Sequence, residues 1–289
     1  MDHFEKLEKV ITYNLNRRKM EGANLTGELE KAAISLKKTN TVLIVTGFVI
    51  KDKLFGETDG PVGAVSVAGA LETLGKNAII ITDMYSKKIL EAALELVDLN
   101  TILEIIDKHD ETDFYETILN KYKPDCLISI ERPGGAADGL MYSMTGECIS
   151  SLVPSMDGLF KEAKKRGLCT IGIGDGGNEI GMGKIRRYVV DNVPYGNIIA
   201  ASFATDYLIL AGVSNWGAHA LVAAMSILLN RDLLYSTETE ERLLRAIVDI
   251  GAVNGMTKQN TLTVDGLGLD ENIKVFNNIR AVIEEYIKN

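Results

Sequence analysis

The sequence predicts an α/β protein with a mainly parallel, doubly wound, Rossmann-like sheet and extra helices at both termini. Short apolar runs of strand length alternate with segments of helical periodicity along most of the chain. Several of these runs end in glycine-rich loops that carry acidic residues. No linker rich in proline, serine or charge divides the chain, so we expect one domain that spans residues 1–289.

The first half of the chain predicts two leading helices and then a regular strand–helix alternation. Leu7, Val10, Ile11 and Leu15 give the first helix an apolar stripe. Pro61 suits the first turn of a later helix, because the N–H that proline lacks is unpaired there in any case. The expected elements are helix 3–19, helix 27–38, strand 41–48, helix 61–75, strand 78–82, helix 86–97, strand 101–106, helix 112–121 and strand 125–130.

The second half continues the alternation less regularly. Ser214 is expected to cap a long apolar helix. The runs at 188–193 and 197–200 predict two short strands, and the glycine-containing connector 258–269 has no clear periodicity. The remaining expected elements are helix 154–166, strand 168–173, strand 206–211, helix 215–229, helix 237–251 and helix 270–288.

Charge, hydropathy and cysteine content exclude several classes of protein. The net charge is −9 and the pI about 5.0, which disfavours a nucleic-acid partner because such proteins present a basic face. No apolar stretch is long enough to predict a membrane span, and the N-terminus lacks the apolar run of a secretory signal. Cys126, Cys148 and Cys169 lack metal-binding spacing, so we expect reduced packing residues in a cytoplasmic protein.

Three loops after predicted strands concentrate the polar residues that suit a ligand site. Parallel strands place such loops at one edge of the sheet, so the loops are expected to line a single crevice. The first loop lies in segment 46–64, the second in 131–139 and the third in 172–184. Their candidate residues are Gly47, Glu57, Asp59, Gly60, Glu131, Arg132, Asp138, Gly174, Asp175, Gly176, Asn178, Glu179 and Lys184.

Familiar nucleotide-binding motifs do not account for these loops. Gly172, Gly174 and Gly177 follow the G-x-G-x-x-G pattern, but Asp175 inside the loop would repel a pyrophosphate. We therefore disfavour a nicotinamide or flavin cofactor. No Walker A motif is present, and the three histidines do not suggest a zinc site or a nucleophilic triad.

The residues alone leave two interpretations open at each acidic position. Asp59 is either a helix N-cap or a ligand-binding carboxylate. Glu131 and Arg132 form either a buried structural ion pair or a pair in which Arg132 binds a carboxylate and Glu131 exchanges protons. Glu57, Asp59 and Asp175 offer the oxygen ligands of a Mg²⁺ site, which is the one cofactor we expect.

Five sequence motifs resemble a known family. They are Thr46-Gly47-Phe48, Glu57–Ala64, Ile130–Gly139, Ile173–Gly183 and Gly212–Gly217. Together, in this order, they resemble the carboxy-terminal domain family of D-glutamate cyclase, whose bacterial stand-alone members are described as a domain of unknown function. The eukaryotic enzyme carries a second, larger domain ahead of this one, which the present sequence does not include.

The resemblance implies a lyase that converts D-glutamate, or a related small acidic amino acid, to 5-oxo-D-proline and water. It implies that Glu131, Asp175 or Glu179 exchanges protons and that Arg132 or Lys184 holds a substrate carboxylate. It further implies a substrate site formed by Gly47, Glu57, Asp59, Gly60, Arg132, Asp138, Gly174, Gly176, Asn178, Lys184 and Asn215.

Alternatives of other classes remain beside the cyclase. One is a non-catalytic module that binds a nucleotide or an amino acid, and another is a metal-assisted hydrolase. The sequence leaves substrate chirality open. The apolar helix that contains 218–229 packs either on the sheet or against a second subunit, so a homodimer is an open alternative to a buried core helix.

Overall fold

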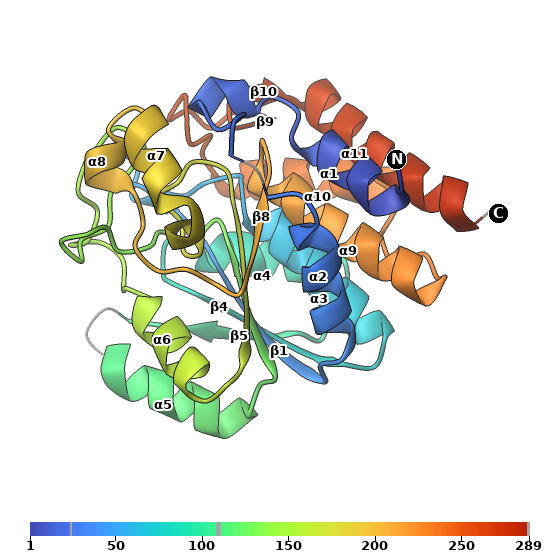
Figure 1. Cartoon of the computed structure of the whole chain (residues 1–289), viewed down its shortest axis with the longest axis horizontal. Helices are drawn as coiled ribbons and strands as arrows, with labels where there is room; N and C mark the ends of the chain where they lie inside the picture. The colour runs from blue at the N-terminus through green and yellow to red at the C-terminus, as the bar shows by residue number, and fades with distance from the viewer. Residues whose placement is uncertain (24, 108–110, 288–289) are drawn as a thin grey trace.

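The computed structural model describes residues 1–23, 25–107 and 111–287, and its centre is a six-stranded sheet in which every pair of neighbouring strands is parallel (Figure 1). The strand order is β5-β4-β1-β6-β7-β8, so the chain builds outward from β1 first on one side and then on the other. This is the Rossmann order, and it confirms the predicted α/β class. The strands are β1 (Thr41–Thr46), β4 (Asn77–Thr82), β5 (Ile102–Ile105), β6 (Cys126–Ile130), β7 (Cys169–Gly174) and β8 (Tyr207–Leu210).

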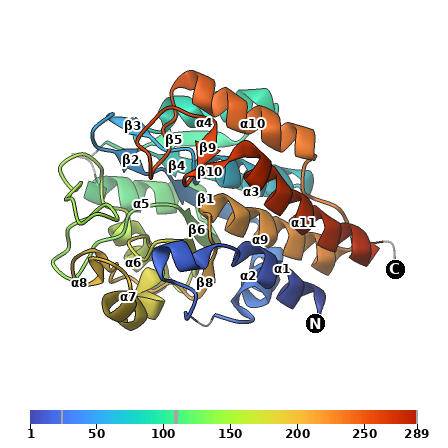
Figure 2. The same ribbon diagram turned by 90° about the horizontal axis from the view of Figure 1, so that it is seen from above.

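The central strands are apolar on both faces because helices cover both faces of the sheet. In β1, Val42 and Ile44 face the larger core, whereas Leu43 and Val45 face a smaller one. The helices of the smaller face are α5 (Glu111–Tyr122) and α6 (Asp157–Lys165). The helices of the larger face are α1 (His3–Ile11), α2 (Glu28–Lys37), α3 (Pro61–Thr73), α4 (Lys87–Leu96), α9 (Ser214–Leu229), α10 (Thr237–Ile250) and α11 (Leu269–Ile287) (Figures 1 and 2).

Helix α9 is buried along Ser214–Ile227. A helix that is apolar nearly all round suits this central position, and α9 packs against α1, α2, α3 and α11 as well as the sheet. The expectation that this helix belongs to the core is therefore confirmed within the chain. None of the described helices combines the length and apolarity that a bilayer crossing requires.

Three parts of the chain differ from the sequence-based prediction. Helix α1 ends at Ile11, and a 3₁₀ turn, η1 (Leu15–Arg18), follows between Asn14 and Lys19, which both adopt left-handed backbone angles. Asparagine tolerates the left-handed conformation, so a helix is not expected to continue through Asn14. The break changes the direction of the chain and carries the arginines of η1 toward the sheet edge.

The strands predicted at 188–193 and 197–200 are wrong. These segments form the helices α7 (Arg186–Asn192) and α8 (Gly196–Ile199), which follow a second 3₁₀ turn, η3 (Met182–Ile185). Val189 packs into a small separate core with Met182 and Leu208, and this tertiary packing outweighs the strand preference of a short β-branched run. Two small hairpins complete the fold: β2 (Val49–Ile50) with β3 (Phe55–Gly56), and β9 (Thr263–Val264) with β10 (Leu267–Gly268).

Candidate active site

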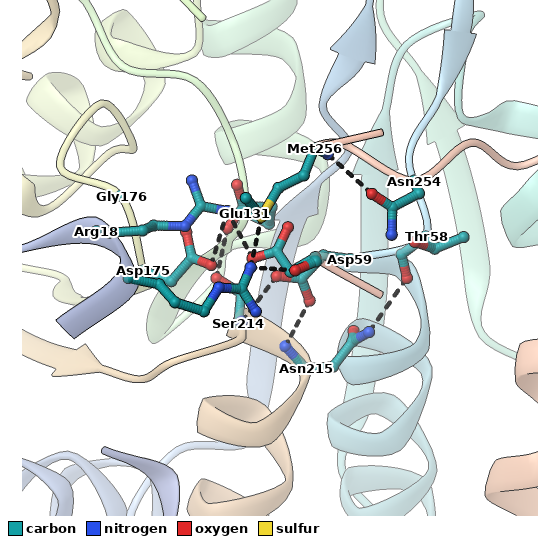
Figure 3. A network of polar contacts seen from close by, with 12 residues as sticks. Arg18, Thr58, Asp59, Glu131, Asp175, Gly176, Ser214, Asn215, Asn254 and Met256 are labelled. Atoms are coloured by element: carbon teal, nitrogen blue, oxygen red, sulfur yellow. Dashed lines mark hydrogen bonds and ion pairs between the residues drawn. The ribbon is translucent and has the colours of Figure 1, made fainter. Parts of the chain in front are cut away.

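Three acidic loops converge where β1 and β6 lie side by side. The chain leaves β1 and β6 in opposite directions across the sheet, and ligands of doubly wound proteins bind at this switch point. Asp59 follows β1, Glu131 follows β6 directly, and Asp175 follows β7. All three side chains are buried, and their carboxylates face one another beside Arg18 (Figure 3).

The backbone around Glu131 is constrained. Glu131 has a φ of 44°, a backbone conformation that residues other than glycine rarely adopt. The hydroxyl of Ser214 donates a hydrogen bond to the Glu131 carboxylate. Gly60 packs against this corner, since a Cβ on Gly60 would lie 2.8 Å from the Cβ of Glu131. The first two loops therefore fit together only with glycine at position 60.

Asp59 and Asn215 tie the starts of two helices together. Asp59 accepts hydrogen bonds from the N–H groups of Ser214 and Asn215, each at 2.8 Å, so it caps α9. The amide oxygen of Asn215 accepts in turn from the N–H groups of Gly60 at 3.0 Å and Gly63 at 2.8 Å. Asn215 is thus a positioning residue, and Asp59 combines capping with a place in the acidic cluster.

Glu179 holds the glycine-rich loop after β7. Its carboxylate accepts from the N–H groups of Asp175 at 3.1 Å, Gly176 at 2.7 Å and Gly177 at 2.7 Å. These are the N–H groups that would bind a phosphate in a nucleotide-binding turn. An internal carboxylate already fills that position, which argues against a dinucleotide at the G-x-G-x-x-G pattern.

Asp175 has no comparable set of donors. It is fully buried, and no N–H group of the described residues donates a hydrogen bond to its oxygens. Its cationic neighbour is Arg18, whose Nη2 lies 3.1 Å from Asp175 Oδ2 and 2.5 Å from Asp265 Oδ2. A buried carboxylate with so few donors is costly unless a proton or a further cation balances it.

The pKa values of the cluster follow from burial and from mutual repulsion. Burial raises the pKa of Glu57, Glu131 and Asp175 well above their ordinary values, and neighbouring carboxylates add to the rise. Burial and Asp265 raise the pKa of Asp59 from 3.8 to about 7. Burial is the largest influence on Asp265 and acts in the same direction, but the charges of Arg18 and Arg17 and side-chain hydrogen bonds with Asp175 and Arg18 together outweigh it and leave the pKa of Asp265 lowered.

A cavity of about 270 Å³ opens beside this cluster. Its polar wall includes Glu57, Glu131 and Asn178, and the cations Arg17, Arg18, Lys51 and Lys258 line it as well. Thioether and aromatic groups of Met144, Met256 and Phe48 complete the wall. The cavity therefore offers both signs of charge within reach of one small molecule.

The same cluster contains a candidate metal site. Ligand oxygens of Asp59, Glu131 and Asp175 all lie within 4.8 Å of one another. Three carboxylates suit a hard divalent cation such as Mg²⁺, and the lack of N–H donors at Asp175 fits a cation in that position. The metal ligands predicted from the sequence were Glu57, Asp59 and Asp175. In the structure Glu131, not Glu57, lies with Asp59 and Asp175.

Several other candidates lie outside the cavity wall. Arg132 is buried in an ion pair with Asp83 and also donates to the carbonyl oxygens of Gly47 at 3.1 Å and Pro154 at 2.8 Å. The sequence left open a structural ion pair between Glu131 and Arg132, but Arg132 pairs with Asp83 instead, and Glu131 accepts a hydrogen bond from Ser214. Arg132 has a structural role and is not placed to bind a substrate in this structure.

Lys184 and Asp138 also have partners elsewhere. Lys184 binds Glu28 and donates to the carbonyl oxygen of Asp206 at 2.7 Å. Asp138 accepts from the Tyr142 hydroxyl at 2.5 Å and from the N–H of Leu140 at 2.9 Å. Neither side chain lines the cavity beside the cluster.

Among the residues that sequence reasoning missed are Arg17, Arg18, Gly255 and Asp265; Lys51 and Lys258 of the cavity wall were missed as well. The two arginines lay inside a helix predicted to run from 3 to 19, and Gly255 and Asp265 lay in or next to the unassigned connector. Two signals were present, namely Asn14 and Asn16 in the first helix and the turn-forming pair Asp265-Gly266. Neither signal reveals that these segments meet the acidic loops.

Fold and geometry together define a Rossmann-type α/β protein with a cluster of buried carboxylates at the carboxyl ends of its strands, where dinucleotide-binding members of this fold class bind their cofactor. Residues 7–280 match the family model described as D-glutamate cyclase-like, C-terminal. The chain belongs to this family. It is similar to a human protein named D-glutamate cyclase, mitochondrial, with 37% identity over 257 residues. The match covers 84% of this chain and 41% of the human protein, so the chain spans about two fifths of that relative's length.

Proposed function

We propose that this chain is a lyase that cyclises a small acidic amino acid, with D-glutamate as substrate and 5-oxo-D-proline and water as products. One observation carries the proposal: the buried carboxyl groups of Glu57 and Glu131 line a cavity that also carries cations, and the carboxylates of Asp59 and Asp175 lie within 4.8 Å of that of Glu131. Membership of the family and the name of the human relative support the choice of substrate.

The reaction needs both a proton acceptor and a proton donor. The substrate ammonium group must lose one proton before its nitrogen attacks the γ-carboxyl carbon and a second proton after the C–N bond has formed. The carboxyl oxygen whose C–O bond breaks must gain two protons to leave as water. A carboxylate accepts a proton efficiently near neutral pH when its pKa is close to 7, which burial achieves at Asp59. Burial also raises the pKa values of Glu57, Glu131 and Asp175, which favours their protonated forms and makes them candidates for the proton donor.

Glu131 and Asp175 are the groups we propose for the proton transfers. Glu131 lines the cavity, and its carboxylate is oriented by Ser214. Asp175 lies close enough to Glu131 for the two to share one cation, and burial raises the pKa of both. Two adjacent carboxyl groups in such surroundings ionise in sequence, so one acts as base while the other keeps its proton.

We propose Mg²⁺, or a similar divalent cation, as the cofactor at Asp59, Glu131 and Asp175. When bound, it would supply positive charge near the oxygen that becomes negative as the amine adds. A carboxylate that binds the cation is ionised, so with the cation bound the proton donor would be Glu57, whose pKa is also raised by burial and which also lines the cavity. The protein's own residues hold the three carboxylates in place through the α9 cap, the Ser214 hydroxyl and the glycine-rich loop.

Turnover tests the proposal directly. Purified protein is incubated with D-glutamate, with and without Mg²⁺, and 5-oxoproline is followed by NMR with L-glutamate as the matched control. We expect 5-oxoproline from D-glutamate, faster with Mg²⁺ and slower after EDTA. No product from folded protein would contradict the cyclase and favour a non-catalytic binding module or a different substrate.

The binding partner, the cellular location and the oligomeric state of the protein are proposals. The partner we propose is a small acidic amino acid, not a nucleic acid or a membrane, in a cytoplasmic protein. The human relative is named as mitochondrial, which concerns that protein. A homodimer remains open and would be decided by light scattering in solution.

A further inference from the structure

The four cations that line the cavity differ in how they are paired. Arg18 contacts Asp175 and Asp265, Lys51 lies 3.0 Å from Glu147, and Lys258 lies 2.7 Å from Asp52. Arg17 lines the same cavity but forms no ion pair with any carboxylate of the described residues. Arg17 also helps to lower the pKa of Asp265 through its charge, but among these four cations it alone has no carboxylate of the described residues within ion-pair distance.

The contacts of Arg17 hold its guanidinium in place without using most of its donors. Its Nη2 contacts the carbonyl oxygen of Asp265 and the sulfur of Met256. Within residues 1–23, 25–107 and 111–287, its Nη1 and Nε groups donate to no other residue. An arginine with free donors in a fork geometry is suited to bind a carboxylate through two hydrogen bonds.

The backbone fixes where Arg17 lies. Arg17 and Arg18 are neighbours in η1, which is bounded on each side by a left-handed residue, Asn14 with φ 70° and Lys19 with φ 61°. Arg18 is anchored in the acidic cluster. The Arg18 ion pairs restrain the backbone of η1, and the contacts of Arg17 with Asp265 and Met256 place its own side chain at the cavity wall.

We propose that Arg17 binds the α-carboxylate of the substrate while the substrate ammonium group faces Glu131 and Asn178. The identity of the substrate rests on the proposed function. The α-carboxylate does not react, so its charge has to be matched by a group outside the carboxyl cluster. Arg132 and Lys184, the candidates from the sequence, are bound to other residues.

Asn178 supplies an independent reason for this orientation. It lines the cavity and is 1% exposed, and its Nδ2 donates to the carbonyl oxygen of Tyr142 at 2.7 Å. Its Oδ1 is buried and accepts from no donor among the described residues. A buried acceptor without a donor suits the N–H groups of an ammonium ion, which has donors and no acceptors.

Three ligands distinguish binding of the substrate's α-carboxylate from binding of its γ-carboxylate. D-glutamate has both carboxylates, D-glutamine keeps only the α-carboxylate, and 4-aminobutyrate keeps only the one that corresponds to the γ-carboxylate. Their affinities are measured by calorimetry for the wild-type protein and for Arg17→Met, with Arg17→Lys as the charge-conserving variant. Arg231→Met is the matched control, because Arg231 is exposed and lies outside the cavity wall.

We expect Arg17→Met to weaken D-glutamate and D-glutamine by about 10- to 100-fold, as for the loss of hydrogen bonds between charged groups. The affinity for 4-aminobutyrate should change by less than about twofold, and Arg17→Lys should lose less than Arg17→Met. Circular dichroism and a thermal melt establish that each variant is folded.

The remaining outcomes are distinguishable. Unchanged affinity for D-glutamine, equal loss for all three ligands, or no binding of any of them by the wild-type protein would overturn the role of Arg17. Arg17-dependent binding without 5-oxoproline formation would support the role of Arg17 in binding the amino acid. It would overturn only the proposed cyclase activity.

Discussion

Arg132 and Arg18 are both arginines at the carboxyl edge of the sheet, but their surroundings differ. Arg132 is fully buried, faces one carboxylate, that of Asp83, and donates to carbonyl oxygens of two loops. Arg18 faces several carboxylates at once and borders the cavity. Arg132 therefore holds loops together, whereas Arg18 balances part of the charge of the site.

Replacing Arg132 tests this difference at the level of one residue. Arg132→Met leaves the buried Asp83 without its cation, so we expect the free energy of unfolding to fall by about 3–5 kcal/mol. Urea denaturation measures the loss. Unchanged stability together with a large rise in KM for D-glutamate would show instead that Arg132 binds substrate.

At the level of elements, the sequence predicted the parts of the site that depend on local chemistry. A buried strand followed by glycine and an acidic residue identified the loops of Asp59, Glu131 and Asp175, because loops at the carboxyl ends of parallel strands meet at one edge. The side-chain partners within these loops did not follow from the pattern. Glu179, for example, binds three N–H groups of its own loop, although the family resemblance suggested a catalytic role.

The elements that the sequence misplaced depend on distant contacts. The early end of α1 brings Arg18 next to Asp175 and Asp265, more than a hundred residues away in each case. Helices α7 and α8 replace predicted strands because Val189 finds a packed core there. Neither outcome is contained in the periodicity of the local sequence.

The segment after α10 lies against Glu57, and two of its glycines allow this contact to be tested. A Cβ on Gly255 would lie 2.0 Å from Glu57 Oε2, whereas a Cβ on Gly268 would meet nothing within 4 Å. We expect Gly255→Ala to displace Glu57 or the connector and to lower kcat/KM by up to about 100-fold, as small misplacements of reacting groups do. Gly268→Ala should have activity close to wild type, and equal activity of the two variants would contradict this arrangement.

At the scale of the whole molecule, the raised carboxyl pKa values link stability to pH. The folded protein holds protons on Glu57, Asp59, Glu131 and Asp175 that the unfolded chain releases above about pH 4. Their contribution to stability is complete below the unfolded pKa and is lost as pH rises through the folded values, which for Asp59 is about 7.

A divalent cation should reverse this loss, because it binds the ionised carboxylates and competes with protons. We expect Tm of the ligand-free protein to fall between pH 5.5 and pH 8, and Mg²⁺ to raise Tm by about 5 °C or more at pH 8 and by less at pH 5.5. Thermal melts at the two pH values measure this difference. An equal or larger effect of Mg²⁺ at pH 5.5 would contradict a site made of Asp59, Glu131 and Asp175.

We propose that buried carboxyl groups at the β1–β6 switch point carry out the cyclisation. The most direct test of this proposal is the rate of 5-oxoproline formation from D-glutamate by Glu131→Gln and Asp175→Asn, compared with Asp138→Asn at an exposed carboxylate of the second loop. We predict that the first two variants lose at least about 100-fold in kcat and that Asp138→Asn stays near wild type. Turnover that survives in both Glu131→Gln and Asp175→Asn would contradict the account.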